Sequence, residues 1–176
     1  MNPRNTLILL GLLTVLLAPP AAGDHDHGAA GAPAAFDRFR ALAGEWVAAE
    51  DSEFAKKGDL VARYAVTSGG SAVIETVFPG TPHEMVTVYH ADGEDVVLTH
   101  YCLGNQPRMR ARGNGAGERV EFAFDGGANI DPATSRHMHS ASFRFLGPDL
   151  FESEWTELGG GEPALVVKTR LARKNG

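Results

Sequence analysis

The chain has 176 residues, of which 16 are Lys or Arg and 22 are Asp or Glu, for a net charge of −6 at pH 7. This acidic balance argues against a nucleic acid or an anionic membrane surface as the partner, because both favour clustered positive charge. Cys102 is the only cysteine, so no disulfide can form within the chain and stability has to come from packing.

The first 23 residues have the pattern of a secretory signal peptide. Arg4 supplies a positive charge, residues 7–17 form a mostly apolar run, and small residues at 21–23 precede Asp24. The run is shorter than the roughly 20 residues of a transmembrane helix, and no cysteine follows it to carry a lipid. We therefore expect a protein that is exported to the periplasm or secreted, with no stable membrane anchor.

Residues 24–34 are rich in Gly, Ala, Asp and His and show no apolar periodicity, which predicts a disordered tail. The next segment, residues 35–43, has Phe36, Phe39 and Leu42 at helical spacing, and Gly44 follows at a typical stop position. This pattern predicts one short amphipathic helix at the start of a single domain that extends from residue 35 to residue 176.

The rest of the chain has the pattern of β-strands. Runs with period-two alternation are separated by short turns rich in Gly, Pro, Asn and Asp, and no helical stretch long enough for a crossover lies between them. We expect an all-β fold, an up-and-down antiparallel barrel, because closing a long meander removes its exposed edges. About ten strands are predicted, near residues 45–50, 59–67, 71–78, 84–90, 95–102, 107–112, 118–124, 137–146, 150–157 and 164–172.

One hairpin suggests which side chains point inward. Taking Asp92 and Gly93 as a two-residue turn pairs Tyr89 with Val96 and Met85 with His100, on the face opposite the acidic residues. The same alternation in later strands places several further side chains inside. These inward sets are Val120, Phe122 and Phe124; His137, His139, Ala141, Phe143 and Phe145; and Phe151, Ser153 and Trp155.

Gly44-Glu45-Trp46, after a short helix and at the start of the first strand, resembles the Gly-x-Trp signature of lipocalins and other calycins. In that superfamily the tryptophan closes one barrel end beneath a basic side chain of the last strand, for which Arg170 or Arg173 is the match here. Ten strands instead of eight would place the chain nearer the fatty-acid-binding and nitrobindin-like branch.

Residues 79–86 and 99–109 are also similar to uncharacterised bacterial lipocalin-like proteins. The resemblance covers most of the chain from residue 36 to residue 173. It implies a fold but indicates no enzymatic reaction. The paired cysteines of many secreted lipocalins are absent.

A barrel of this size can hold a small ligand among its inward side chains. Apolar side chains mixed with a few polar ones suit a small apolar or amphiphilic molecule, although a filled core would need a similar mixture. Asn105 lies in a loop that can border the barrel mouth. The predicted ligand-binding residues are Tyr89, His100, Asn105, His137, His139 and Trp155.

Two alternatives use the same polar residues. His137, His139 and His100 can form a three-histidine metal site, or one histidine can hold haem, which would make the barrel a metal- or haem-dependent enzyme. The sequence has no catalytic motif, so no catalytic residue is assigned and the cofactor stays unknown. On the predicted outer face, Arg108, Arg110 and Arg112 form either an anion site or a set of cross-strand charge pairs.

Overall fold

The computed structural model describes residues 33–113 and 117–174. The predicted signal peptide, residues 1–23, and most of the predicted tail, residues 24–34, lie outside the described residues. No helix in the described ranges is long and apolar enough to cross a bilayer.

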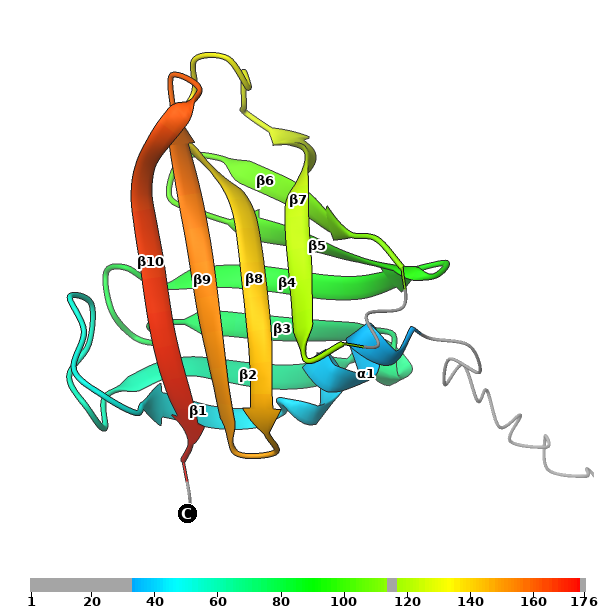
Figure 1. Ribbon diagram of the computed structural model, residues 1–176, viewed down its shortest axis with the longest axis vertical. Coiled ribbons are helices and arrows are strands. Elements are labelled where there is room, and N and C mark those ends of the chain that lie inside the picture. The colour runs from blue at the N-terminus through cyan, green and yellow to red at the C-terminus, as the bar shows by residue number, and fades with distance from the viewer. Residues whose placement is uncertain (1–32, 114–116, 175–176) are drawn as a thin grey trace, which may run out of the picture.

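The fold is the predicted one, a closed antiparallel barrel of ten strands with one short helix before the first strand (Figure 1). Each strand pairs with its neighbours in the chain, and β1 pairs with β10 to close the sheet. The elements are α1 (Ala34–Ala41), β1 (Gly44–Ala48), β2 (Leu60–Thr67), the short 3₁₀ helix η1 (Ser68–Gly70), β3 (Ala72–Val77), β4 (Met85–Asp92), β5 (Asp95–Tyr101), β6 (Gln106–Ala111), β7 (Arg119–Ala128), β8 (His137–Gly147), β9 (Leu150–Gly159) and β10 (Glu162–Arg173).

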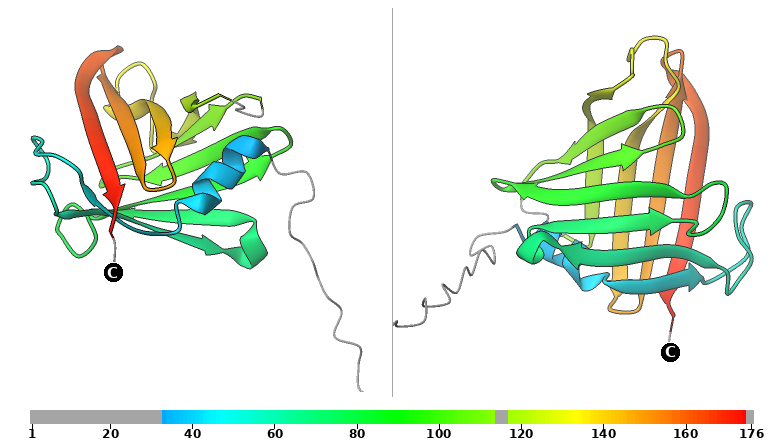
Figure 2. Two further views of the ribbon diagram at one scale, coloured as in Figure 1. Left: turned by 60° about the horizontal axis from the view of Figure 1, so that its bottom comes forward. Right: turned by 180° about the vertical axis from the view of Figure 1, so that it is seen from behind.

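The barrel is flattened into two walls. Figure 1 shows β2 to β5 lying across the view while β8 to β10 run down it, so the two walls cross over the interior. The helix α1 lies between these walls at one end, as the two views of Figure 2 also show. The loops that join β1 to β2 and β3 to β4 lie at the opposite side of Figure 1 from α1.

The helix closes its end of the barrel with aromatic side chains. Phe36 and Phe39 are fully buried, and the Phe39 ring stacks on Tyr89 of β4 with ring centroids 4.5 Å apart. The same ring meets Phe143 of β8 edge-on at 5.1 Å, so Phe39 joins both walls. Aromatic contacts of this kind bury large apolar areas, and they leave this end of the interior filled.

Trp46 and Arg173 pack together where the first and last strands of the barrel pair. The Trp46 indole is fully buried and donates a hydrogen bond to the carbonyl of Leu42 at 2.7 Å. The Arg173 guanidinium lies 4.4 Å from the centroid of that ring and donates to the carbonyls of Ala41 and Ala43. Of the two arginines proposed for this contact, Arg173 is therefore the one that packs on the tryptophan.

The predicted hairpin register between β4 and β5 is wrong by two residues. Asp92 pairs with Asp95, so the turn consists of Gly93 and Glu94, and Tyr89 pairs with Leu98 instead of Val96. Gly93 takes a φ of 62°, a conformation that tight hairpin turns require and that glycine adopts without strain. Because side chains alternate with a period of two, a shift of two residues keeps every side chain on its predicted face.

Candidate ligand-binding cavity

The barrel interior holds a cavity of about 430 Å³, bordered by the loops that join β1 to β2 and β3 to β4. No residue of α1 lines it. Its walls come mainly from apolar side chains of both sheet walls, with Glu75, His100, Ser153 and Thr169 as the polar strand residues. The full set is Phe54, Val61, Ala62, Glu75, Val77, Phe78, Thr81, His83, Met85, His100, Met138, Ser153, Trp155, Leu165, Val167, Thr169 and Leu171.

β10 contributes aliphatic side chains and one threonine to the cavity wall. Its lining residues are Leu165, Val167, Thr169 and Leu171, and the first three are only half-buried. Near α1, by contrast, the space between the walls is filled by phenylalanine and tyrosine rings. The same sheet therefore encloses a packed half and an open half.

A row of polar side chains crosses one wall of the barrel. Tyr64 of β2 pairs with Glu75 of β3, Glu75 pairs with Thr87 of β4, and Thr87 pairs with His100 of β5. Directly paired residues of antiparallel strands lie on the same face, so these four side chains follow one another across four strands. The register of the sheet thus brings together polar groups that are far apart in the sequence.

Glu75 is the centre of this row. Its carboxylate is 4% exposed and accepts hydrogen bonds from the Tyr64 hydroxyl at 2.5 Å and from the Tyr89 hydroxyl at 2.6 Å. Burial raises the pKa of Glu75, and hydrogen bonds from Tyr64, Tyr89 and Thr87 offset part of that rise. Burial and the neighbouring carboxylate raise the pKa of both tyrosines well above the usual value, so both stay protonated donors.

His100 ends the row inside the cavity. Its Nδ1 lies 2.9 Å from the Thr87 hydroxyl oxygen, and its ring lies 4.9 Å from that of Trp155 on the opposite wall. Burial lowers the pKa of His100 to about 4, because the charged ring would lose its surrounding water. His100 is therefore neutral at pH 7.

Of the six predicted ligand-binding residues, the structure brings His100 and Trp155 to the cavity wall. Tyr89 is fully buried in the aromatic cluster, where its hydroxyl reaches Glu75 but its side chain does not line the cavity. Asn105 is also absent from the lining. Its amide donates to the carbonyl of Arg136 at 2.7 Å, which joins the β5–β6 loop to the β7–β8 loop.

His137 and His139 do not line the cavity, and a β-bulge explains why. Met138 pairs with Glu157 and Ser140 with Thr156, which leaves His139 as an extra residue in β8. The bulge interrupts the alternation on which the prediction depended, and Met138 lines the cavity instead. His137 is 2% exposed, and its Nε2 lies 3.1 Å from Nδ1 of His139.

The three histidines do not form one cluster. His137 and His139 contact each other and Phe124, whereas His100 contacts Thr87 and Trp155. Within residues 33–113 and 117–174, no group of three or more His, Cys, Asp or Glu side chains is arranged to hold a metal ion.

Cys102 is half-buried, and its surroundings keep the thiol protonated. Burial and the nearby Glu157 carboxylate raise its pKa to about 12. The thiolate, which is the nucleophilic form, is therefore scarce at pH 7.

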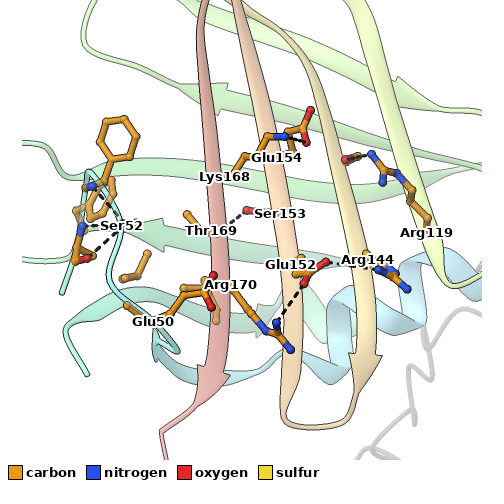
Figure 3. A pocket seen from close by; sticks show the side chains of 17 residues that line it. Glu50, Ser52, Arg119, Arg144, Glu152, Ser153, Glu154, Lys168, Thr169 and Arg170 are labelled. Carbon is orange, nitrogen blue, oxygen red and sulfur yellow. Dashed lines mark hydrogen bonds and ion pairs between the residues drawn. The ribbon is translucent and has the colours of Figure 1, made fainter. Parts of the chain in front are cut away.

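A second hollow of about 340 Å³ borders the cavity and shares six lining residues with it: Phe54, Val61, Phe78, Ser153, Thr169 and Leu171. Figure 3 shows its charged rim on β7 to β10, where Lys168 contacts Glu154 at 3.2 Å. Glu152 lies 3.8 Å from both Arg144 and Arg170 in the same view. These charges are paired with one another across strands, which is typical of a solvated face.

The arginines of β6 form charge pairs in the same way. Arg110 contacts Asp92 at 2.8 Å, Asp95 at 3.0 Å and Asp125 at 3.2 Å, and Arg108 also contacts Asp125. Of the two interpretations of this strip, the contacts favour cross-strand charge pairs over an anion site.

The sequence interpretation missed Glu75, the one carboxylate on the cavity wall. It alternates with Val73 and Val77 in β3 and therefore shares their face. An acidic residue on the apolar face of a strand is an unusual feature, because charged side chains are rarely buried without partners. Its two tyrosine partners lie on β2 and β4, and the pairing of the strands is what brings them to it.

Comparison with protein-family models, with curated proteins and with solved structures gives no match to this chain. The closed antiparallel barrel is compatible with a lipocalin-like fold. The cavity is therefore interpreted from its own geometry and chemistry.

Proposed function

We propose that this protein is an exported binding protein that holds a small, largely apolar ligand with one polar end inside its barrel. The observation that supports this proposal most strongly is the cavity itself, an interior space lined by apolar side chains with Glu75 and His100 on one wall. Few polar groups at fixed positions in an otherwise apolar pocket are typical of small-molecule sites.

The size and composition of the cavity agree with this role. Its volume of about 430 Å³ falls in the usual range for small-molecule pockets, roughly 300–1,000 Å³. Burying apolar ligand surface contributes about 25 cal/mol per Å², so the hydrophobic effect supplies most of the affinity. The half-buried Leu165 and Val167 are the side chains that a ligand would cover.

Export is part of the proposal and is supported by the signal-like pattern of residues 1–23. The acidic net charge of −6 supports a small molecule and not a nucleic acid as the partner.

A neutral fluorescent probe, N-phenyl-1-naphthylamine, tests the binding function. We expect its emission to rise when it enters the barrel, and Val167→Phe to weaken its binding about tenfold or more, because the new ring occupies the cavity. Val166→Phe is the matched control, since Val166 is exposed on the outer face of the same strand. Equal binding by both variants, or no binding by the unmodified protein, would contradict the proposal.

A second measurement identifies the natural ligand. Protein purified from its own host is denatured, and the released small molecules are identified by mass spectrometry. We expect an apolar molecule in the unmodified protein and less of it in Val167→Phe, with Val166→Phe unchanged.

A further inference from the structure

We propose that the cavity selects ligands whose polar end is a cationic amine and rejects ligands that end in a carboxylate. This inference rests on the proposed binding function and adds the chemical class of the ligand. Its basis is the charge pattern of the wall, where Glu75 is the one acidic residue and no Lys or Arg is present among the lining residues.

The ionisable groups that line the cavity are Glu75, His100 and His83. His83 is exposed in the loop between β3 and β4, at the border of the cavity. His100 is deep in the barrel and is neutral at pH 7, so it adds no positive charge to the wall. An anionic head group would therefore find no cation inside the cavity to compensate for the water it loses.

The hydroxyl groups that donate hydrogen bonds to Glu75 favour its ionised form. The hydroxyls of Tyr64 and Tyr89 each have one proton, and among the described residues each finds its acceptor in Glu75. With an ionised carboxylate both protons are used. The Thr87 hydroxyl also hydrogen-bonds Glu75 and lowers its pKa, so hydroxyl groups from three side chains surround the carboxylate and favour its charged form.

The two hydrogen bonds have the geometry expected for a charged acceptor. Their lengths of 2.5 and 2.6 Å match the short O–H···O⁻ bonds that carboxylates accept. Tyr64, Tyr89 and Thr87 each use one acceptor position, whereas a carboxylate offers about four. Because Glu75 also lines the cavity, a ligand donor can reach the position that these three hydroxyls leave unused.

An ionised carboxylate inside an apolar cavity has a high energetic cost, because it has lost its water and has no ion-pair partner among the residues it contacts. An ammonium group would supply that partner and donate up to three hydrogen bonds. A second carboxylate would instead add like-charge repulsion at short range, where the interior screens poorly. The wall therefore distinguishes head groups by the sign of their charge.

Three probes with one apolar tail and different heads test this selectivity: decylamine, an ammonium ion at pH 7; decanol, which is neutral; and decanoic acid, an anion. Each is titrated below its micelle-forming concentration against the protein loaded with N-phenyl-1-naphthylamine, and displacement of the probe is followed. We expect decylamine to bind about tenfold or more tightly than decanoic acid, with decanol between them.

Glu75→Gln tests the source of the preference. This variant removes the charge and keeps the side-chain shape, so we expect the ratio of the decylamine and decanoic acid affinities to fall about tenfold or more. Glu121→Gln is the matched control: it makes the same change in net charge at a side chain that is 74% exposed, and the ratio should stay unchanged.

Each outcome either supports or overturns the inference. Equal binding of the three probes, or tighter binding of decanoic acid, overturns the head-group preference while the binding function stands. If no probe displaces the naphthylamine and that dye itself does not bind, the binding function fails first. The comparison of the three probes on the unmodified protein is sufficient by itself if Glu75→Gln does not fold.

Discussion

The Tyr89 hydroxyl donates a 2.6 Å hydrogen bond to Oε2 of Glu75, a carboxylate that is 4% exposed and lies on the neighbouring strand. Tyr64 donates to the other oxygen of the same carboxylate from the strand on the opposite side. A buried acid is thus held by hydroxyl groups from the two strands that flank its own, and the three side chains link β2, β3 and β4.

Removing one of these donors should destabilise the fold. Tyr89→Phe keeps the ring in the aromatic cluster and removes only the hydroxyl, which leaves one oxygen of Glu75 short of a donor. We expect the free energy of unfolding in urea to fall by about 1–3 kcal/mol. Tyr101→Phe, at a position that is 48% exposed, should change it by less than about 0.5 kcal/mol. Equal effects at both positions would mean that the hydrogen bond to Glu75 contributes nothing.

Glu75 should make the protein less stable as the pH rises. Its pKa in the folded protein is raised above the ordinary value of 4.5, so between these two values the folded state binds more protons than the unfolded state. The stabilising contribution of Glu75 is therefore fully present below about pH 4.5, and it is lost as the pH rises through the raised pKa.

The comparison that isolates this contribution uses Glu75→Gln, which cannot titrate. Urea unfolding of both proteins at several pH values should show the variant gaining stability relative to the unmodified protein as the pH rises. A difference that is the same at every pH would show that Glu75 has an ordinary pKa in the fold.

His100 should have the opposite pH dependence. Its pKa is lowered from 6.5 to about 4, so the unfolded state binds the extra proton between these values. Stability that depends on neutral His100 is present above pH 6.5 and is lost as the pH falls toward 4. Relative to His100→Gln, the unmodified protein should lose about 2 kcal/mol between pH 7 and pH 5. A titration of the His100 ring by NMR with a midpoint near 6.5 would contradict this.

Arg173 should be important for stability and Arg170 should not. Arg173 packs on Trp46 and donates to backbone carbonyls of the segment that joins α1 to β1, whereas Arg170 lies on the outer face, 3.8 Å from Glu152. Arg173→Lys cannot reproduce the planar stacking or the set of hydrogen bonds, and we expect a loss of about 1–2 kcal/mol. Arg170→Lys should have almost no effect. Thermal unfolding of the two variants provides the comparison.

Gly127 should tolerate no side chain. A Cβ at this position would lie 2.5 Å from the carbonyl oxygen of Gln106 and 2.9 Å from Cα of Pro107, both of which are backbone atoms of the paired strand. Gly127→Ala should therefore destabilise the protein by about 1–3 kcal/mol. Gly104→Ala is the control, because a Cβ there meets nothing within 4 Å. A melting temperature equal to that of the control would show that β6 and β7 can separate at this point.

Gly126 and Gly127 also show why the end of the seventh strand could not be predicted from the sequence. We expected the seventh strand to end near residue 124, because paired glycines are typical of loops. In the structure β7 continues to Ala128, with an extra residue in β7 opposite the Pro107–Met109 segment of β6. Glycine inside a strand marks a bulge or a close backbone approach as readily as it marks a turn, and the alternation of residues cannot distinguish these.

The alternation of apolar and polar residues and the spacing of turns were sufficient to predict the short helix, ten antiparallel strands and their closure. These features could be predicted because each depends on local chemistry: a strand buries every second side chain, and a short turn returns the chain to its neighbour. Even the two-residue error in the β4–β5 register left the set of inward side chains unchanged. Successive side chains alternate between the two faces of a strand, so a shift by an even number of residues keeps each one on its face.

The tertiary structure alone decided where the barrel is hollow and which polar groups meet there. The bulge at His139 placed Met138 on the cavity wall, and the pairing of four strands placed Tyr64, Glu75, Thr87 and His100 in one row. Both results depend on pairing between strands and on the volumes of side chains distant in the sequence. A cavity is what remains after all of those side chains have packed, so no single segment encodes it.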